Sequence, residues 1–308
     1  MSILVFSEDR EHAYQLLAKA AEIAEKMGTE VYALAVDDSQ GFINHGADKV
    51  LLAELGEFAV EPYRAALLKA VMISGAETVL IGATKRGKEI APRIAAALNA
   101  GCMTDCTSVE YSDDKIVVER LTYGGSTIAK ETSTSKPTVI TVPPRSFDKL
   151  EPKEKTGEVI KLSFEVPPAR VKVLERREKH KGDQDLENAD IIVSAGRGFK
   201  NKEDLKILEE LAEALGGAAI GCTRPISADL GWMDDWVGIS GKKVKPNLYI
   251  TCGISGQIQH VAGIRDSKII VSINKDEGAG IHGVSDYSII GDIYEVVPAL
   301  IKALKEKA

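Results

Sequence analysis

The sequence predicts two doubly wound α/β domains, and three observations lead to this fold class. The chain has 308 residues, which at roughly 150 residues per domain corresponds to two domains. Short apolar runs alternate with amphipathic stretches in both halves of the chain. A charged segment with several prolines, residues 143–190, separates the two alternating regions. We therefore expect an N-terminal domain over residues 1–186 and a C-terminal domain over residues 187–308.

The N-terminal domain is expected to begin with a βαβ unit that continues into a parallel sheet. The expected strands are 3–6, 30–36, 47–54 and 77–83, and the expected helices are 12–28, 62–76 and 87–101. Gly28 stands where a helix C-cap is expected, and Pro62 opens the second helix. Pro92 lies inside the third helix pattern and is expected to mark its first turn.

From residue 109 the pattern changes to shorter strands that are separated by Asp-Asp and Gly-Gly turns. These strands are VEYS, KIVVERL and TVITV. Turns of this kind favour antiparallel pairing, so we expect antiparallel strands appended to the parallel core.

The C-terminal domain restarts the alternation and is predicted to hold a second parallel sheet with helices on both faces. Its strands are apolar without strict alternation, as expected when both faces of a sheet are covered. The expected strands are 189–199, 218–224, 247–253 and 268–274, and the expected helices are 202–217, 257–264 and 292–305.

Composition and charge exclude several functional classes. The formal net charge is −7 and both halves are mildly acidic, which argues against a nucleic-acid partner. The uncharged run 246–264 contains glycine, glutamine, asparagine and histidine, and therefore predicts a buried strand and turn, not a membrane span. The chain enters an apolar strand directly at its N-terminus, so we expect a cytoplasmic protein. Cys102 and Cys106 lack a second ligand pair at metal-binding spacing, so no metal site is expected.

Three junctions at which an apolar strand meets a glycine turn follow residue 190. They span residues 194–198, 253–256 and 288–292. None is a complete GxGxxG motif, and each alone is compatible with ordinary strand–helix packing. Glycine turns before helices present backbone N–H groups to anions, and the carboxyl ends of parallel strands meet at one sheet edge. Together the junctions predict a site for a dinucleotide or a flavin diphosphate.

Several side chains near this edge could contact such a ligand, and all but Arg224 have an ordinary structural alternative. Arg197 lies in the first turn and could pair with a pyrophosphate or remain a solvated surface arginine. Arg224 ends a strand and places a positive charge at the same edge. His260 could hydrogen-bond a redox ring or be a core histidine. Asn274 and Asp292 could contact ribose or adenine, although Asp292 also has the position of a helix N-cap. No nucleophile elbow, HExxH or P-loop is present to carry hydrolytic chemistry.

The run LYITCGISGQIQHVAGIRDSKIIVSINKDEGAGIHGVSDYSIIGDIYEVVPAL resembles the signature of the electron transfer flavoprotein alpha subunit. The segments IIVSAGRGF, GCTRP, VGISGK and APRIAAALNAGCMTDC extend the resemblance over nearly the whole chain. It implies an N-terminal nucleotide-hydrolase-like (HUP-type) α/β domain with appended strands that contacts a partner subunit. It also implies a C-terminal doubly wound, Rossmann-like domain that binds FAD.

The resemblance further implies a protein that carries electrons, which favours a non-enzymatic role over an enzymatic one. The alpha chain would form a heterodimer with a beta subunit that holds AMP or a second FAD. Electrons would pass from flavoprotein dehydrogenases of the acyl-CoA dehydrogenase type, as in fatty acid beta-oxidation, to a quinone oxidoreductase or another acceptor. One alternative is the FAD subunit of an electron-bifurcating flavoprotein that oxidises NADH. Another is an adenine-nucleotide-binding regulatory module, since the first half alone has that α/β character.

Matching the family's motifs assigns roles along the C-terminal domain. Arg197 would contact FAD phosphate, Thr223 and Arg224 would border the isoalloxazine, and residues 237–240 would line it. Within that loop, Ser240 is the expected donor to the N5 edge. Residues 255–260 would wrap the pyrophosphate and ribityl, with His260 near the pyrimidine oxygen. Asn274, Asp292 and Ile293 would serve the adenosine end. The expected cofactor-binding residues are Arg197, Thr223, Arg224, Val237, Gly238, Ile239, Ser240, Ser255, Gly256, Gln257, Ile258, Gln259, His260, Asn274, Asp292 and Ile293.

The chain departs from the family pattern at three places. It has Val237-Gly-Ile239-Ser240-Gly241 where VGQTG is usual, so a ring-side amide becomes aliphatic and the hydroxyl loses its methyl group. The spacing from Arg224 to Trp232 is one residue longer and that from Trp232 to Val237 is shorter, which affects the loop that carries Ser240. The pair Ile281-His282 replaces a more common apolar pair.

Overall fold

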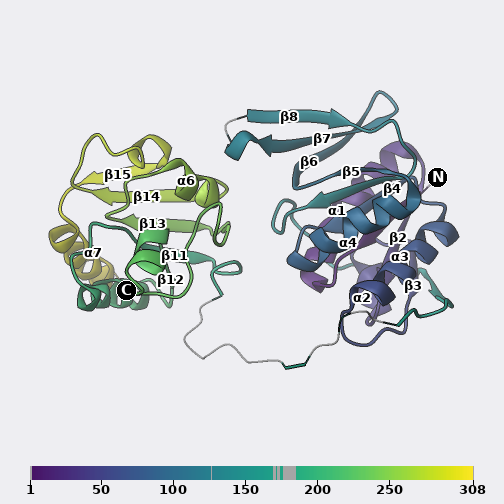
Figure 1. Ribbon diagram of the computed structural model, residues 1–308, viewed down its shortest axis with the longest axis horizontal. Coiled ribbons are helices and arrows are strands. Elements are labelled where there is room, and N and C mark those ends of the chain that lie inside the picture. Colours follow the sequence, from purple (N-terminus) through teal and green to yellow (C-terminus); the bar gives the residue numbers. More distant parts are fainter. Residues whose placement is uncertain (1, 126, 169–170, 172–173, 176–184, 308) are drawn as a thin grey trace. The chain divides into compact units, whose positions relative to one another are not determined.

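The computed structural model describes residues 2–307 apart from 126, 169, 170, 172, 173 and 176–184 (Figure 1). It divides into an N-terminal unit, residues 1–175, and a C-terminal unit, residues 176–308. The expected boundary at residue 186 stays a prediction, because much of the segment before it lies outside the described residues. Among the described residues, no helix is both long enough and apolar enough to cross a membrane.

The N-terminal unit contains a seven-stranded sheet in the order β10-β3-β2-β1-β4-β9-β5, and every neighbouring pair is parallel. The strands are β1 (Ser2–Phe6), β2 (Glu30–Ala35), β3 (Lys49–Leu52), β4 (Thr78–Gly82), β5 (Gly101–Met103), β9 (Thr138–Val142) and β10 (Glu158–Lys161). The helices are α1 (Arg10–Met27), α2 (Ser39–Asn44), α3 (Val60–Ser74) and α4 (Lys85–Leu98). The predicted parallel core is therefore confirmed.

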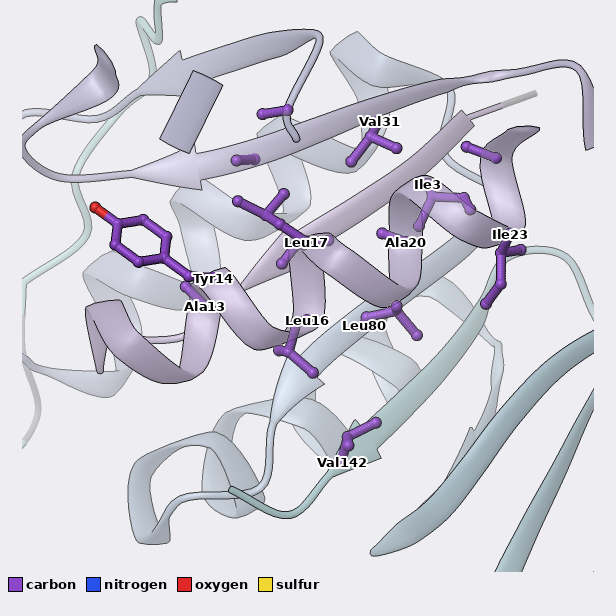
Figure 2. Close-up of a cluster of buried hydrophobic side chains, with 14 of the residues drawn as sticks. Ile3, Ala13, Tyr14, Leu16, Leu17, Ala20, Ile23, Val31, Leu80 and Val142 are labelled. Carbon is purple, nitrogen blue, oxygen red and sulfur yellow. The ribbon is translucent and has the colours of Figure 1, made fainter. Parts of the chain in front are cut away.

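In helix α1, the apolar side chains spaced three or four residues apart form the face that packs against the sheet. Its buried side chains, among them Leu16, Leu17, Ala20 and Ile23, lie against the strands of the sheet in one apolar cluster (Figure 2). The cluster includes the strand residues Ile3, Leu80 and Val142. The carboxylate of Asp9 caps the start of the helix, and Gly28 ends it in a left-handed conformation with φ of 63°. The predicted C-cap at Gly28 is confirmed.

Two expectations for this unit are wrong. The segment TVITV is β9, a parallel strand of the main sheet, because its fully buried pattern requires cover on both faces. The antiparallel strands form a separate three-stranded sheet of β6 (Cys106–Ser112), β7 (Lys115–Thr122) and β8 (Thr127–Thr132). Pro92 lies inside α4, which starts at Lys85 because the Thr84 hydroxyl accepts from the Gly87 N–H and caps the helix there.

The C-terminal unit contains a five-stranded parallel sheet in the order β12-β11-β13-β14-β15. The strands are β11 (Ile191–Ala195), β12 (Ala219–Cys222), β13 (Leu248–Cys252), β14 (Ile269–Asn274) and β15 (Tyr287–Ile290). The helices are α5 (Lys206–Ala214), α6 (Ile258–Ile264) and α7 (Ile293–Lys307), with short helical turns η2 (Lys202–Leu205), η3 (Pro225–Asp229) and η4 (His282–Val284).

Two buried clusters cover opposite faces of this sheet. Residues of α5 and α7 pack on one face and Ile264 of α6 packs on the other, so the predicted doubly wound arrangement is confirmed. The strand order changes direction at β11, since β12 lies on one side of it and β13 on the other. In open α/β sheets, ligands bind beyond the carboxyl ends of the strands at such a switch point.

Candidate functional site

The glycine turns after β11 and β13 interlock at the switch point. The N–H of Gly196 donates to the Cys252 carbonyl at 2.9 Å, and the N–H of Gly198 donates to the Gly253 carbonyl at 3.0 Å. A Cβ on Gly198 would lie 2.7 Å from the Cα of Gly253, so this approach requires glycine. Arg197 stands exposed between the two interlocked glycines.

The third junction joins the same edge. The N–H of Gly291, before α7, donates to the Asn274 carbonyl at the end of β14 at 3.2 Å. The side-chain amide of Asn274 in turn donates to the carbonyl of Ile254, which follows β13, at 2.7 Å. Backbone contact also links Ser255 to the turn before η4, where the N–H of Ile281 donates to the Ser255 carbonyl at 3.2 Å. The structure thus brings the three glycine junctions together.

The segment 235–242, called here the ring loop, is the second part of the site. Its base is closed by an ion pair of 2.5 Å between Asp235 and Lys242. The N–H of Val237 donates to the Cys222 carbonyl at the end of β12, at 2.9 Å. The N–H of Ile239 donates to the Gln259 carbonyl in α6, at 2.8 Å. These bonds place the predicted residues 237–240 beside residues 257–260.

The imidazole of His260 is buried beneath the ring loop, and both of its nitrogens have hydrogen-bond partners. Its Nδ1 lies 3.0 Å from the Val237 carbonyl oxygen, and its Nε2 lies 3.4 Å from the Tyr249 hydroxyl. Burial lowers the pKa of His260 to about 4, so the ring is neutral near pH 7. The structure shows the core-histidine arrangement; a place beside a cofactor stays a prediction for this residue.

Thr223 and Arg224 follow β12 at the same edge. The Thr223 side chain is 9% exposed, and its hydroxyl oxygen is buried with no hydrogen-bond partner among the described residues. A buried polar atom without a partner costs free energy unless another group satisfies it. Arg224 is exposed and carries a positive charge next to this hydroxyl in the sequence. The pair therefore provides an unused hydrogen-bonding group and a cation at the predicted ring position.

The rim of the site is apolar at two exposed positions. Ile239 of the ring loop is 45% exposed and Ile258 at the start of α6 is 67% exposed. Large aliphatic side chains at this exposure suit contact with a flat apolar surface. Their exposed neighbours Ser240, Ser255 and Gln257 supply polar groups.

The predicted residues of the adenosine end have structural contacts of their own. The Asp292 carboxylate accepts from the Tyr294 N–H at 2.9 Å and caps α7, as its sequence position indicated. Ile293 is buried in the core, so only its backbone is available at the edge. The Asn274 side chain accepts from the Asp276 N–H at 3.0 Å in addition to its bond with Ile254. Contact of these residues with a ligand stays a prediction.

Sequence reasoning missed two aromatic residues of this site. Trp236 donates its indole N–H to the Ser240 hydroxyl at 3.3 Å, and Tyr249 contacts His260. Neither pair has a sequence signal, because both contacts depend on loop and sheet geometry and not on a helical or strand period. The Nδ1 of His282 lies 3.1 Å from the Ser272 hydroxyl oxygen, and its Nε2 lies 3.1 Å from the Asp276 carbonyl oxygen.

The same unit contains a cavity of about 490 Å³. It is lined by η2, α5, Ile220 and residues 232–235. None of the predicted site residues lines it. The cavity adjoins the ring loop at Asp235, while the predicted residues form an open edge of the sheet.

The fold and this edge place the chain among the doubly wound α/β proteins with a switch-point site. Two family models match it: an electron transfer flavoprotein domain over residues 3–167, and an electron transfer flavoprotein FAD-binding domain over residues 185–265. The chain belongs to the electron transfer flavoprotein alpha subunit family. The resemblance in the sequence motifs is thereby confirmed.

Relatives in this family match nearly the full length of the chain. Protein FixB of Clostridium saccharobutylicum is 37% identical over 323 residues, covering 99% of this chain and 96% of the relative. The electron transfer flavoprotein subunit alpha of Clostridium acetobutylicum is 37% identical over 324 residues, covering 98% of this chain and 96% of the relative. The putative electron transfer flavoprotein subunit YdiR of Escherichia coli K12 is 35% identical over 310 residues, covering 98% of both chains.

Proposed function

We propose that this chain is the FAD-binding subunit of a heterodimeric electron carrier. With a beta subunit, it accepts electrons from flavoprotein dehydrogenases of the acyl-CoA dehydrogenase type and delivers them to a quinone oxidoreductase or another acceptor. The observation that carries the proposal is the meeting of the interlocked glycine turns with the ring loop at one sheet edge. The match of the FAD-binding domain over residues 185–265 supports it.

The residues at the edge fit the chemistry of FAD. Glycine at 196, 198 and 253 lets the turns after β11 and β13 interlock at the edge, and Arg197 is exposed there to pair with a diphosphate. The buried Thr223 hydroxyl without a partner and the exposed Ser240 hydroxyl supply hydrogen bonds at the ring. When bound, FAD supplies reversible electron uptake, and the protein sets its affinity and potential. Arg224 opposes negative charge there and raises the potential.

The exposure of the sheet edge supports the proposed heterodimer. Arg197, Arg224, Ile239 and Ser240 are all exposed in this chain. A small-molecule site normally buries most of its ligand, so a second surface must cover the cofactor. The relative from Clostridium acetobutylicum is named as a subunit alpha, which supports a beta subunit as that surface.

The test is coexpression of this chain with its beta subunit, followed by an absorbance spectrum and extraction and counting of the cofactors. A yellow heterodimer with one FAD plus AMP is the expected result for a simple carrier. Two FAD per heterodimer would indicate a bifurcating flavoprotein that oxidises NADH. A heterodimer that stays colourless when supplied with FAD would contradict the proposal, and bound ATP or AMP without flavin would indicate a regulatory module.

A further inference from the structure

The indole of Trp236 contacts the hydroxyl that is expected to face the flavin. Its Nε1 lies 3.3 Å from the Oγ of Ser240. An indole N–H can only donate, so the Ser240 oxygen is the acceptor in this bond. The hydroxyl hydrogen of Ser240 is then free to donate to a different group.

The direction of the indole is set by its packing and by Gly241 and Lys242, and not by Ser240. The side chain of Trp236 packs against the cluster that covers the α5 and α7 face of the sheet. Its carbonyl accepts from the Lys242 N–H at 2.8 Å, next to the Asp235–Lys242 ion pair. A Cβ on Gly241 would lie 2.6 Å from Cδ1 and 2.7 Å from Nε1 of the indole, so the ring fits only against a glycine.

We propose that Trp236 is a positioning residue for the flavin and acts through Ser240. Its N–H occupies one lone pair of Ser240 and turns the hydroxyl hydrogen away from the indole, towards the cofactor edge. A hydroxyl that accepts a hydrogen bond also becomes a stronger donor. Trp236 therefore raises the flavin potential by strengthening the hydrogen bond that Ser240 donates to the ring as the ring takes up negative charge. This inference rests on the proposed function.

A double-mutant cycle tests the inference in the coexpressed heterodimer. The variants are Trp236→Phe, Ser240→Ala and the double variant, and the measurement is the midpoint potential of the bound flavin. We expect Trp236→Phe to lower the potential, Ser240→Ala to lower it further, and the double variant to match Ser240→Ala alone. Trp232→Phe is the control and is expected to keep the parent potential, because Trp232 lines the cavity beside η2 and α5 and Trp236 is the indole that donates to Ser240.

Two outcomes would overturn the inference: a Trp236→Phe heterodimer with the parent potential, or single effects that add fully in the double variant. Additive effects would mean that Trp236 acts on loop structure alone. A parent heterodimer without FAD would instead refute the proposed function.

A second readout needs no cofactor. The chain has two tryptophans, so the indole N–H resonances of ¹⁵N-labelled full-length protein can be assigned with the two Trp→Phe variants. Ser240→Ala is expected to shift the Trp236 resonance and leave that of Trp232 in place. An unmoved Trp236 resonance would show that the hydrogen bond is absent and would overturn the inference by itself.

Discussion

The Nδ1 atom of His260 lies 3.0 Å from the carbonyl oxygen of Val237, and this contact fixes the position of the imidazole proton. A carbonyl can only accept, so Nδ1 carries the hydrogen and Nε2 is the acceptor for the Tyr249 hydroxyl. The neutral ring thus ties α6 to the ring loop and offers no N–H on its Nε2 side.

The first prediction concerns the protonation of His260. Its pKa of about 4 lies below the ordinary value of ~6.5, so the unfolded chain binds a proton at mildly acidic pH and the folded chain does not. Protonation of this group leaves stability unchanged above pH ~6.5 and lowers it by up to about 1.4 kcal/mol per pH unit between pH ~6.5 and the folded-state pKa of about 4. In NMR titrations, the ring signals of His260 are expected not to shift between pH 8 and pH 5. A midpoint near 6.5 would contradict the buried, bonded arrangement, and His260→Gln assigns the signals.

The second prediction concerns the Thr223 hydroxyl. Thr223→Val removes a buried oxygen that has no partner among the described residues, at nearly constant volume. We expect the cofactor-free protein to gain about 1 kcal/mol of unfolding free energy and the heterodimer to bind FAD more weakly. The control is Thr138→Val, since the Thr138 hydroxyl donates to the Ser135 carbonyl at 2.8 Å and its loss should lower stability. Denaturant unfolding and FAD titration measure the two effects, and unchanged FAD affinity would remove Thr223 from the site.

The third prediction separates backbone strain from a clash at Gly256. Gly256 has φ of +81°, and a Cβ there would overlap the backbone nitrogen of Ile281. Gly231 has φ of +64° and nothing within 4 Å of an added Cβ. Gly231→Ala should therefore cost about 1–2 kcal/mol from strain alone, while Gly256→Ala should cost more and weaken FAD binding. Equal losses in denaturant unfolding would show that the turn at 280–281 does not constrain Gly256.

The fourth prediction concerns the charge of Arg224. Arg224→Ala is expected to lower the midpoint potential of the flavin, because a positive charge that stabilises the reduced ring is lost. Arg224→Lys should retain most of the parent potential. Arg265→Ala is a matched control, since this arginine is exposed but follows α6 at the opposite edge of the sheet. A reduction titration of Arg224→Ala that overlays the parent curve would exclude this role.

The sequence was sufficient for those parts of the fold that depend on local pattern. The cap at Gly28, the alternation in both units and the glycine junctions all follow from periodicity and turn chemistry. The pairing of β9 could not be predicted, because a short apolar strand has the same appearance in a parallel and an antiparallel sheet. Strand β10 was missed for a related reason: four residues in a charged segment gain their strand conformation by pairing with β3.

Within the candidate site, the glycine turns could be predicted from the sequence, but the contacts made by the ring loop could not. The turns that carry Arg197 and Gly256 could be located because glycine marks where backbones approach closely. The engagement of His260 by Val237 could not be predicted, since the two residues are 23 positions apart and meet only when the ring loop folds onto α6. The contact of Trp236 with Ser240 likewise depends on the closure of the loop by Asp235 and Lys242.

Because the base of the ring loop is closed, the two residues at its tip can be substituted without disturbing the rest of the loop. Asp235 and Lys242 hold the stem, and Val237 and Gly238 are buried against the sheet and α6. Ile239 and Ser240 are the exposed positions between these anchors. Substitution at these two positions changes the chemical groups presented at the edge of the sheet while the scaffold beneath keeps its packing. On the proposed function, exchange of these two side chains would tune the flavin potential without changing the packing of the domain.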